Sequence, residues 1–203
     1  MPPVELWESF FGSPADIFDT LGCHSVGGDA VEFGCGYGTF TVALAPRISG
    51  TLYALDIDPA MVRATAARAA EMGARNVIVE QRDFVSAGSG RSTGSVSFVM
   101  LFNILHIEDP MGLLFEAHRI LGDDGTAAVI HWKHDIQTPR GPPLAIRPRL
   151  EQCRDWAELA GFRCPHLSHV LPHSPWHWGM LLKRRCEGEA LSGADLAAAR
   201  IRP

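Results

Sequence analysis

An acidic residue followed by three alternating glycines is the part of this sequence best suited to hold a ligand. Glu32 lies in a short apolar run, and Gly34, Gly36 and Gly38 come directly after that run. Glycine has no Cβ atom, so it permits positive φ and lets a ligand lie against bare backbone, beside the amides that open the next helix. The spacing predicts a sharp break from strand to helix at which a small molecule binds.

Alternating apolar runs and helix-like segments are expected to position this break. The runs predict strands over residues 30–34, 51–56, 76–81, 96–102 and 126–132. Helices are predicted over residues 38–46, 59–72, 110–121 and about 149–160, with a turn over 122–125. This alternation is typical of a parallel sheet with helices on both faces.

The end of the chain departs from that pattern. Two further strands, residues 164–171 and 178–183, are joined by a Pro- and Ser-containing turn with no crossover helix, so one of them should be antiparallel. We therefore predict an α/β, three-layer Rossmann-like fold with a seven-stranded, mostly parallel sheet and one antiparallel strand in a C-terminal hairpin. Residues 191–201 are predicted to form a short helix.

The composition favours one globular domain with a small partner. The chain has 203 residues and a formal net charge of −5, so there is no basic field to attract nucleic acid or anionic lipid. The N-terminus lacks a basic region followed by an apolar one, and five scattered cysteines suit reduced thiols. We expect a cytoplasmic protein with no membrane or nucleic-acid partner; the oligomeric state is left open.

Four segments at the ends of predicted strands carry a resemblance to a known family. They are residues 31–38 (VEFGCGYG), 55–59 (LDIDP), 82–84 (RDF) and 102–106 (FNILH). In this order they resemble class I S-adenosylmethionine-dependent methyltransferases, particularly the small-molecule type similar to the ubiquinone/menaquinone biosynthesis group. Residues 117–125 (AHRILGDDG) also look like the R-x-L-x-P-G-G helix end of that group, with Asp-Asp where Pro-Gly is usual.

The resemblance implies a cofactor and a division of the chain. The cofactor would be S-adenosylmethionine, leaving S-adenosylhomocysteine as product. Residues 1–27 would form an N-terminal helical lid, residues 28–184 the S-adenosylmethionine-binding methyltransferase domain, and residues 185–203 a C-terminal tail. The cofactor-binding residues would be Glu32, Gly34, Cys35, Gly36, Asp56, Ile57, Asp83, Phe84 and Asn103.

Several of these residues have a chemical reason for their place. Asp56, 20 residues after Gly36, can accept hydrogen bonds from both ribose hydroxyls, a contact that also occurs in NAD-binding folds. Asp83 can accept a hydrogen bond from the adenine amino group, while Ile57 and Phe84 offer apolar faces to the purine.

The opposite end of the ligand calls for different chemistry. Glu32 and the backbone carbonyls near Gly34 and Asn103 suit a ligand end that bears an ammonium and a sulfonium. A dinucleotide fingerprint would place a third glycine where this chain has Thr39, which disfavours a nicotinamide cofactor.

His106 is the candidate catalytic residue. A sulfonium already activates its methyl group, so the protein must supply alignment and a dry site. A general base is needed only if the acceptor is protonated, and His106, just after the fourth strand, is the best-placed candidate by analogy. The alternative is a histidine that only packs beside the cofactor.

Acceptor choice is expected to depend on two segments outside the common core. Trp7, Phe10 and Phe11 could form an apolar wall over the cofactor, or could simply attach the first helix to the sheet. The segment 133–149, which we call the flap, is rich in Pro and Arg. It could favour an anionic acceptor or be an ordinary solvated loop. Its basic residues are Lys133, His134, Arg140, Arg147 and Arg149.

Three classes of function follow. The leading one is methyl transfer, by in-line displacement, to a small molecule that the sequence does not identify. The alternatives are a nicotinamide-dependent oxidoreductase and a non-catalytic module that retains the fold. No metal site is expected, because Pro172 and Pro175 prevent a helix that would align His169, His173 and His177.

Overall fold

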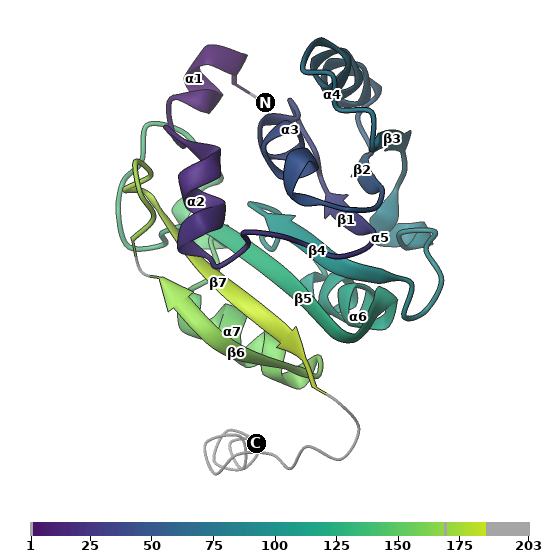
Figure 1. Cartoon of the computed structure of the whole chain (residues 1–203). Helices are drawn as coiled ribbons and strands as arrows, with labels where there is room; N and C mark the ends of the chain where they lie inside the picture. Colours follow the sequence, from purple (N-terminus) through teal and green to yellow (C-terminus); the bar gives the residue numbers. More distant parts are fainter. Residues whose placement is uncertain (1, 169, 186–203) are drawn as a thin grey trace.

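Seven strands form one sheet in a computed structural model that describes residues 2–168 and 170–185 (Figure 1). The strand order is β3-β2-β1-β4-β5-β7-β6. The strands are β1 Ala30–Phe33, β2 Leu52–Asp56, β3 Val77–Gln81, β4 Val96–Phe102, β5 Leu121–Trp132, β6 Phe162–Ser168 and β7 His177–Arg184. Strands β1 to β5 pair in parallel, and β7 runs antiparallel to both of its neighbours. The predicted fold class is confirmed.

Helices connect these strands and cover both faces of the sheet. They are α1 Val4–Glu8, α2 Pro14–Thr20, α3 Thr39–Leu44, α4 Pro59–Glu71, α5 Phe84–Ala87, α6 Pro110–Ile120 and α7 Leu150–Leu159, with 3-10 turns η1 Ala45–Arg47 and η2 Leu144–Ile146. Asp58 and Asp109 cap α4 and α6 through their carboxylates, each directly before a proline. Local sequence therefore sets where both helices begin.

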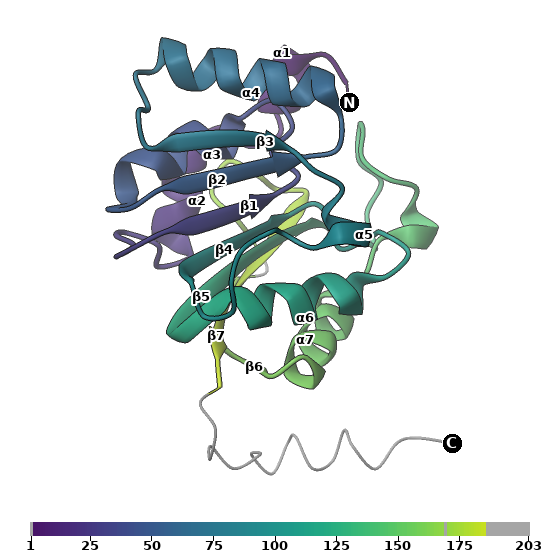
Figure 2. The ribbon, with the colours of Figure 1, turned by 90° about the vertical axis from the view of Figure 1, so that its right-hand side faces the viewer.

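Strand β4 shows why the sheet needs helices on both sides. Its residues alternate between two buried clusters: Phe98 and Met100 pack with α2 and α3, whereas Val99 and Leu101 pack with α6 and α7. Figure 2 shows these helices on opposite sides of the sheet. A strand that is apolar on both faces is typical of a parallel sheet buried between two helical layers.

The predicted turn over residues 122–125 is incorporated into a strand. Strand β5 begins at Leu121, which pairs with Val96, and the register then shifts before Phe98 pairs with Thr126. The Gly122–Gly125 segment is thus an irregularity within β5 rather than a loop before it. Pairing with β4 outweighs the local turn preference of glycine and aspartate.

Helix α2 lies beside α3 on one face of the sheet (Figure 1). Phe11 and Phe18 are buried, and their rings contact Phe40 of α3 edge to face. The predicted C-terminal helix over residues 191–201 lies outside the described residues, as do Cys186 and His169.

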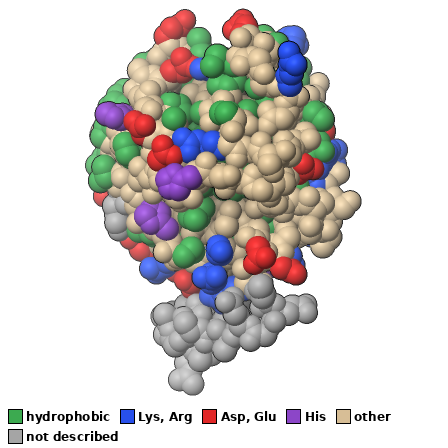
Figure 3. All heavy atoms as spheres, viewed as in Figure 1, with side chains coloured by type: hydrophobic (Ala, Val, Ile, Leu, Met, Phe, Trp, Pro, Cys, Tyr) green, Lys and Arg blue, Asp and Glu red, His purple; other side chains and the backbone are tan. Residues whose placement is uncertain are grey.

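Charged side chains of both signs are interspersed on the face seen in Figure 3. None of the helices within residues 2–168 and 170–185 is long and apolar enough to cross a membrane.

Candidate functional site

The loop after β1 adopts the backbone that the glycines allow. Gly34, Gly36 and Gly38 all have positive φ, at 79°, 54° and 74°. A Cβ atom on Gly38 would also lie 3.1 Å from the Thr65 side chain of α4. The predicted break between strand and helix is present, and larger residues at these positions would strain it.

Asp56, at the end of β2, is attached to this loop. Its carboxylate accepts the Gly36 N–H at 2.9 Å and the Asp58 N–H at 3.0 Å. Each carboxylate oxygen has a second lone pair, so both can still accept a hydroxyl from a ligand. The two backbone amides hold the carboxylate at the carboxyl edge of the sheet, where ligands bind in open α/β folds.

Glu32 lies beneath the loop and is almost completely buried. Its carboxyl accepts the Thr41 hydroxyl at 2.5 Å. Burial raises its pKa to about 8, and the nearby Asp56 carboxylate adds to the shift. Glu32 is therefore mainly protonated at neutral pH, and its contact with a ligand ammonium stays a prediction.

Asp83 and Phe84 follow β3, and both have structural contacts. The Asp83 carboxylate caps α5 by accepting the N–H groups of Val85 and Ser86. The Ser86 hydroxyl, which also donates to it, is the main cause that lowers the pKa of Asp83, and the two N–H groups add to this effect. The Phe84 ring is buried edge-on against Phe33, at 5.2 Å between ring centroids. Ile57, by contrast, is 58% exposed and free to cover a ligand.

Asn103, directly after β4, is the most unusual residue of the site. It has a φ of 54°, rare for a residue other than glycine. Both polar atoms of its side-chain amide are buried without a protein partner. Unpartnered buried polar groups are costly, so this amide is suited to a polar ligand. Cys35 is also buried; burial raises its pKa, which keeps the thiol protonated.

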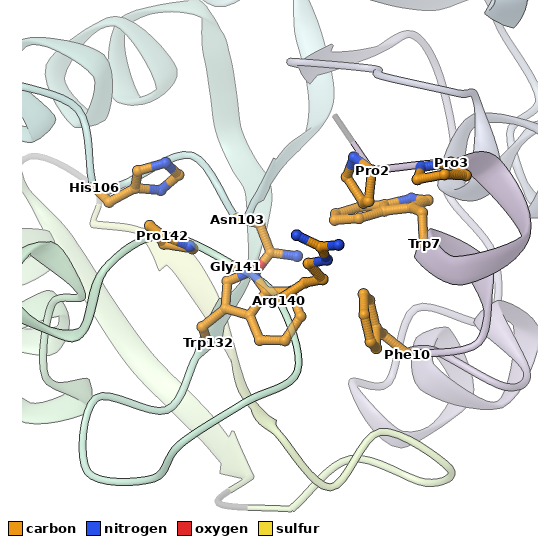
Figure 4. A pocket seen from close by; sticks show the side chains of 10 residues that line it. All are labelled: Pro2, Pro3, Trp7, Phe10, Asn103, His106, Trp132, Arg140, Gly141 and Pro142. Carbon is orange, nitrogen blue, oxygen red and sulfur yellow. The ribbon is translucent and has the colours of Figure 1, made fainter.

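A cavity of about 610 Å³ opens beside Asn103, between the N-terminal helices and the flap (Figure 4). Trp7 and Phe10 line one side, and His106 and Pro142 line the other. Arg140 extends into the space between these sides. The remaining lining residues are Pro2, Pro3, Trp132 and Gly141. The size suits a small molecule.

The flap is held over this cavity by Arg147. This side chain is 7% exposed, and its guanidinium donates to the carbonyls of Lys133 and Pro142 and to the Thr138 hydroxyl. It also lies 5.5 Å from the centre of the Trp132 ring. Arg147 is thus a buried structural residue, whereas Arg140 is the flap cation that faces the cavity.

The N-terminal aromatic residues lie in two different environments. Phe11 is completely buried against α3, which attaches the segment to the sheet. Trp7 and Phe10 line the cavity. The Tyr37 hydroxyl, from the glycine loop, also donates to the Pro2 carbonyl at 2.7 Å.

His106 lines the cavity and contacts a second histidine. Its Nδ1 lies 3.3 Å from Nε2 of His131, which is completely buried in β5. Burial, with a smaller effect of the Arg147 cation, lowers the pKa of His106, so its ring is neutral at pH 7. Within residues 2–168 and 170–185 there is no cluster of three or more metal-ligating side chains.

Sequence analysis did not predict Trp132 or Pro142 as site residues, because they lie at the end of a predicted strand and in the flap. His131 was considered only together with His134, as a candidate metal ligand, and not as a partner of His106. The only signal was indirect: side chains at the carboxyl ends of neighbouring parallel strands meet at one edge.

The polar groups at this edge fit S-adenosylmethionine. Asp56 would hold the ribose, and the unpartnered Asn103 amide would meet the polar methionyl end. The glycine loop would let the ligand approach the backbone.

Comparisons with known proteins agree. Residues 30–125, slightly less than half of the chain, match a family model described as a methyltransferase domain. A SAM dependent methyltransferase from Aquifex aeolicus is 21% identical, with a TM-score of 0.75 over 86% of this chain and 90% of its own. An S-adenosylmethionine dependent methyltransferase from Mesorhizobium loti is 15% identical, with a TM-score of 0.63 over 79% of this chain and 93% of its own. No curated protein gives a significant match.

The fold alone does not define the reaction. The cyclase SpnF is also similar, at 14% identity and a TM-score of 0.68, over 83% of this chain and 79% of its own. Residues 30–125 match a methyltransferase domain, and the fold is the one found in these S-adenosylmethionine-dependent methyltransferases.

Proposed function

We propose that this protein transfers a methyl group from S-adenosylmethionine to a small, planar molecule that carries an anionic group and an acidic hydroxyl. The observation that supports this most directly is the cavity beside Asn103. Its walls are largely aromatic or proline rings, with one cation, Arg140, and one neutral base, His106. The proposal includes the resemblance of this chain to methyltransferases of the ubiquinone/menaquinone biosynthesis group.

The walls of the cavity suggest the shape and charge of the acceptor. The rings of Trp7, Phe10 and Trp132 would stack or pack against a flat apolar body. The Arg140 guanidinium would pair with a carboxylate or a similar anion on it. A cavity of about 610 Å³ accommodates such a molecule, and aromatic walls would exclude water from it.

The chemistry divides between the cofactor and the chain. When bound, S-adenosylmethionine supplies a methyl group already activated by its positive sulfur. Asp56 and Asn103 would orient the ligand, and the cavity walls would align the acceptor oxygen in line with the methyl group. The His106 ring would take the hydroxyl proton as the new oxygen–carbon bond forms.

Calorimetric titration tests the cofactor, with S-adenosylmethionine, S-adenosylhomocysteine and NADH as separate ligands. We expect the first two to bind and NADH not to bind. Binding of NADH alone would contradict the proposal and support an oxidoreductase.

Transfer of labelled methyl groups tests the acceptor class. A panel of hydroxylated aromatic acids, with the corresponding neutral amides as matched controls, would be incubated with the full chain and labelled S-adenosylmethionine. We expect the acids to be labelled preferentially, and Arg140→Gln to raise their KM about tenfold with little change in kcat. Arg149→Gln, which removes an exposed flap cation outside the cavity lining, is the control. Label in a macromolecule, but in none of the panel, would contradict the proposed acceptor.

A further inference from the structure

Both ring nitrogens of His131 have a partner. Its Nδ1 lies 3.2 Å from the Trp132 carbonyl oxygen, and its Nε2 lies 3.3 Å from Nδ1 of His106. The His131 ring is completely buried and stacks on Trp178, with 5.9 Å between centroids and 27° between planes. The packing leaves this ring in a fixed orientation toward His106.

The positions of the protons follow from these contacts. A carbonyl oxygen only accepts, so Nδ1 of His131 must carry the hydrogen. Burial lowers the pKa of His131 to about 3, so the ring is neutral and its Nε2 has a lone pair but no hydrogen. That nitrogen can only accept, and His106 must therefore donate from its own Nδ1. The Nε2 of His106 is left without a hydrogen.

We propose that His131 is a positioning residue that holds His106 in the Nδ1–H tautomer and so keeps the Nε2 lone pair available as the base for methyl transfer. The inference rests on the proposed function. Free histidine in water prefers the opposite tautomer, in which Nε2 carries the hydrogen and cannot accept a proton. In many enzymes a carboxylate accepts a hydrogen bond from the catalytic base and so fixes its tautomer. Here the neutral ring of His131, buried in β5, would have that role.

The proton transfer balances without any further group. The hydroxyl proton of the acceptor moves to Nε2 of His106 as its oxygen bonds to the methyl carbon. The carbon–sulfur bond breaks, and its electron pair stays on sulfur. His106 becomes an imidazolium that still donates Nδ1–H to His131, and it later releases the Nε2 proton to water.

Two groups that face His106 affect this charge. His131 remains neutral because it is buried, and the Arg147 cation of the flap repels the imidazolium. Both features favour prompt release of the proton after the reaction.

Nitrogen-15 NMR of the histidine side chains in the free, full-length protein tests the inference without any ligand. The signals of His106 are assigned by their loss in His106→Gln. We expect the Nδ1–H tautomer for His106 in the unaltered protein, and a shift to Nε2–H in His131→Leu, which removes the acceptor. His131→Gln keeps an oxygen that can accept from His106 and should retain Nδ1–H. An Nε2–H tautomer in the unaltered protein would overturn the inference, as would retention of Nδ1–H in a folded His131→Leu.

Kinetics give a second readout once the panel has supplied an acceptor. We expect His131→Leu to lower kcat at least tenfold, with little change in KM or in S-adenosylmethionine affinity, and His131→Gln to restore most of kcat. If His131→Leu does not fold, two other measurements test the inference. An Nδ1–H tautomer of His106 in the unaltered protein, together with most of kcat retained in His131→Gln, would support it, and an Nε2–H tautomer would overturn it. Absence of S-adenosylmethionine binding would refute the proposed function and leave the tautomer result unaffected, so the two failures are distinguishable.

Discussion

Asp56 is the residue on which cofactor affinity should depend most directly. Backbone amides of Gly36 and Asp58 hold its carboxylate at the edge of the sheet. Asp56→Asn would keep the size of the side chain but replace a charge-assisted hydrogen bond with a neutral one. We expect S-adenosylmethionine to bind more weakly by about 1.5–3 kcal/mol, roughly 10- to 150-fold in Kd, as measured by calorimetry.

A matched carboxylate serves as the control for this measurement. Asp29 also accepts a backbone N–H, from Thr51 at 2.7 Å, but lies just before β1 at the opposite edge of the sheet. Asp29→Asn should lose stability without losing S-adenosylmethionine affinity. Equal affinity losses in Asp29→Asn and Asp56→Asn would show a general effect on the fold rather than a contact at Asp56.

Individual site residues differ in how far the sequence predicts them. The glycine spacing and Asp56 are local signals, and the structure joins them by the hydrogen bond from Gly36 to Asp56. The sequence predicts that Phe84 offers an apolar face to a purine, and in the structure its ring also contacts the ring of Phe33. His131 carried no signal for its contact with His106, because that pairing depends on how two strand ends meet.

At the scale of elements, segments with strong local signals were predicted closely. Strand β4 was predicted with its observed bounds, because seven successive apolar or small residues lie between a glycine turn and Asn103. Strand β5 was predicted too short by five residues at its start, since its pairing with β4 draws Leu121 into the sheet. Long-range pairing of this kind is not visible in local propensity.

The flap is the element whose order should depend on one side chain. Arg147 is buried and donates to two flap carbonyls and to a threonine hydroxyl. We expect Arg147→Gln to lower the free energy of unfolding by about 2–3 kcal/mol, because these acceptors lose a charged donor. Amide hydrogen exchange should become faster at residues 134–142, because these residues belong to no helix or strand.

Arg149, an exposed arginine of the flap, provides the control. Arg149→Gln should leave both the unfolding free energy and the exchange rates of the flap close to their original values. If the amides of residues 134–142 exchange no faster in Arg147→Gln than in Arg149→Gln, the Arg147 guanidinium does not hold the flap in place.

At the scale of the whole molecule, the cavity combines segments that lie far apart in the chain. Pro2 and Trp7 come from its beginning, Asn103 and His106 from its middle, and Arg140 from the flap. Their types were visible in the sequence, but their convergence follows from the strand order, which brings the ends of β4 and β5 side by side. The shape of the cavity is therefore a property of the assembled fold rather than of any one motif.

The stability of the whole molecule should fall as the pH rises from about 6.5 to 8, because of Glu32. Its pKa is about 8 in the folded protein and near 4.5 when unfolded, so between these values the folded state binds more protons and loses stability with rising pH. The buried histidines His106, His131 and His177 have lowered pKa values, so they reduce stability only below about 6.5. We expect the unfolding free energy, measured with urea, to fall by up to about 1.4 kcal/mol per pH unit in this window.

Glu32→Gln, which stays neutral, should abolish this slope, and Glu71→Gln at the exposed end of α4 should preserve it. Identical slopes in all three proteins would mean that Glu32 is ionised throughout the window.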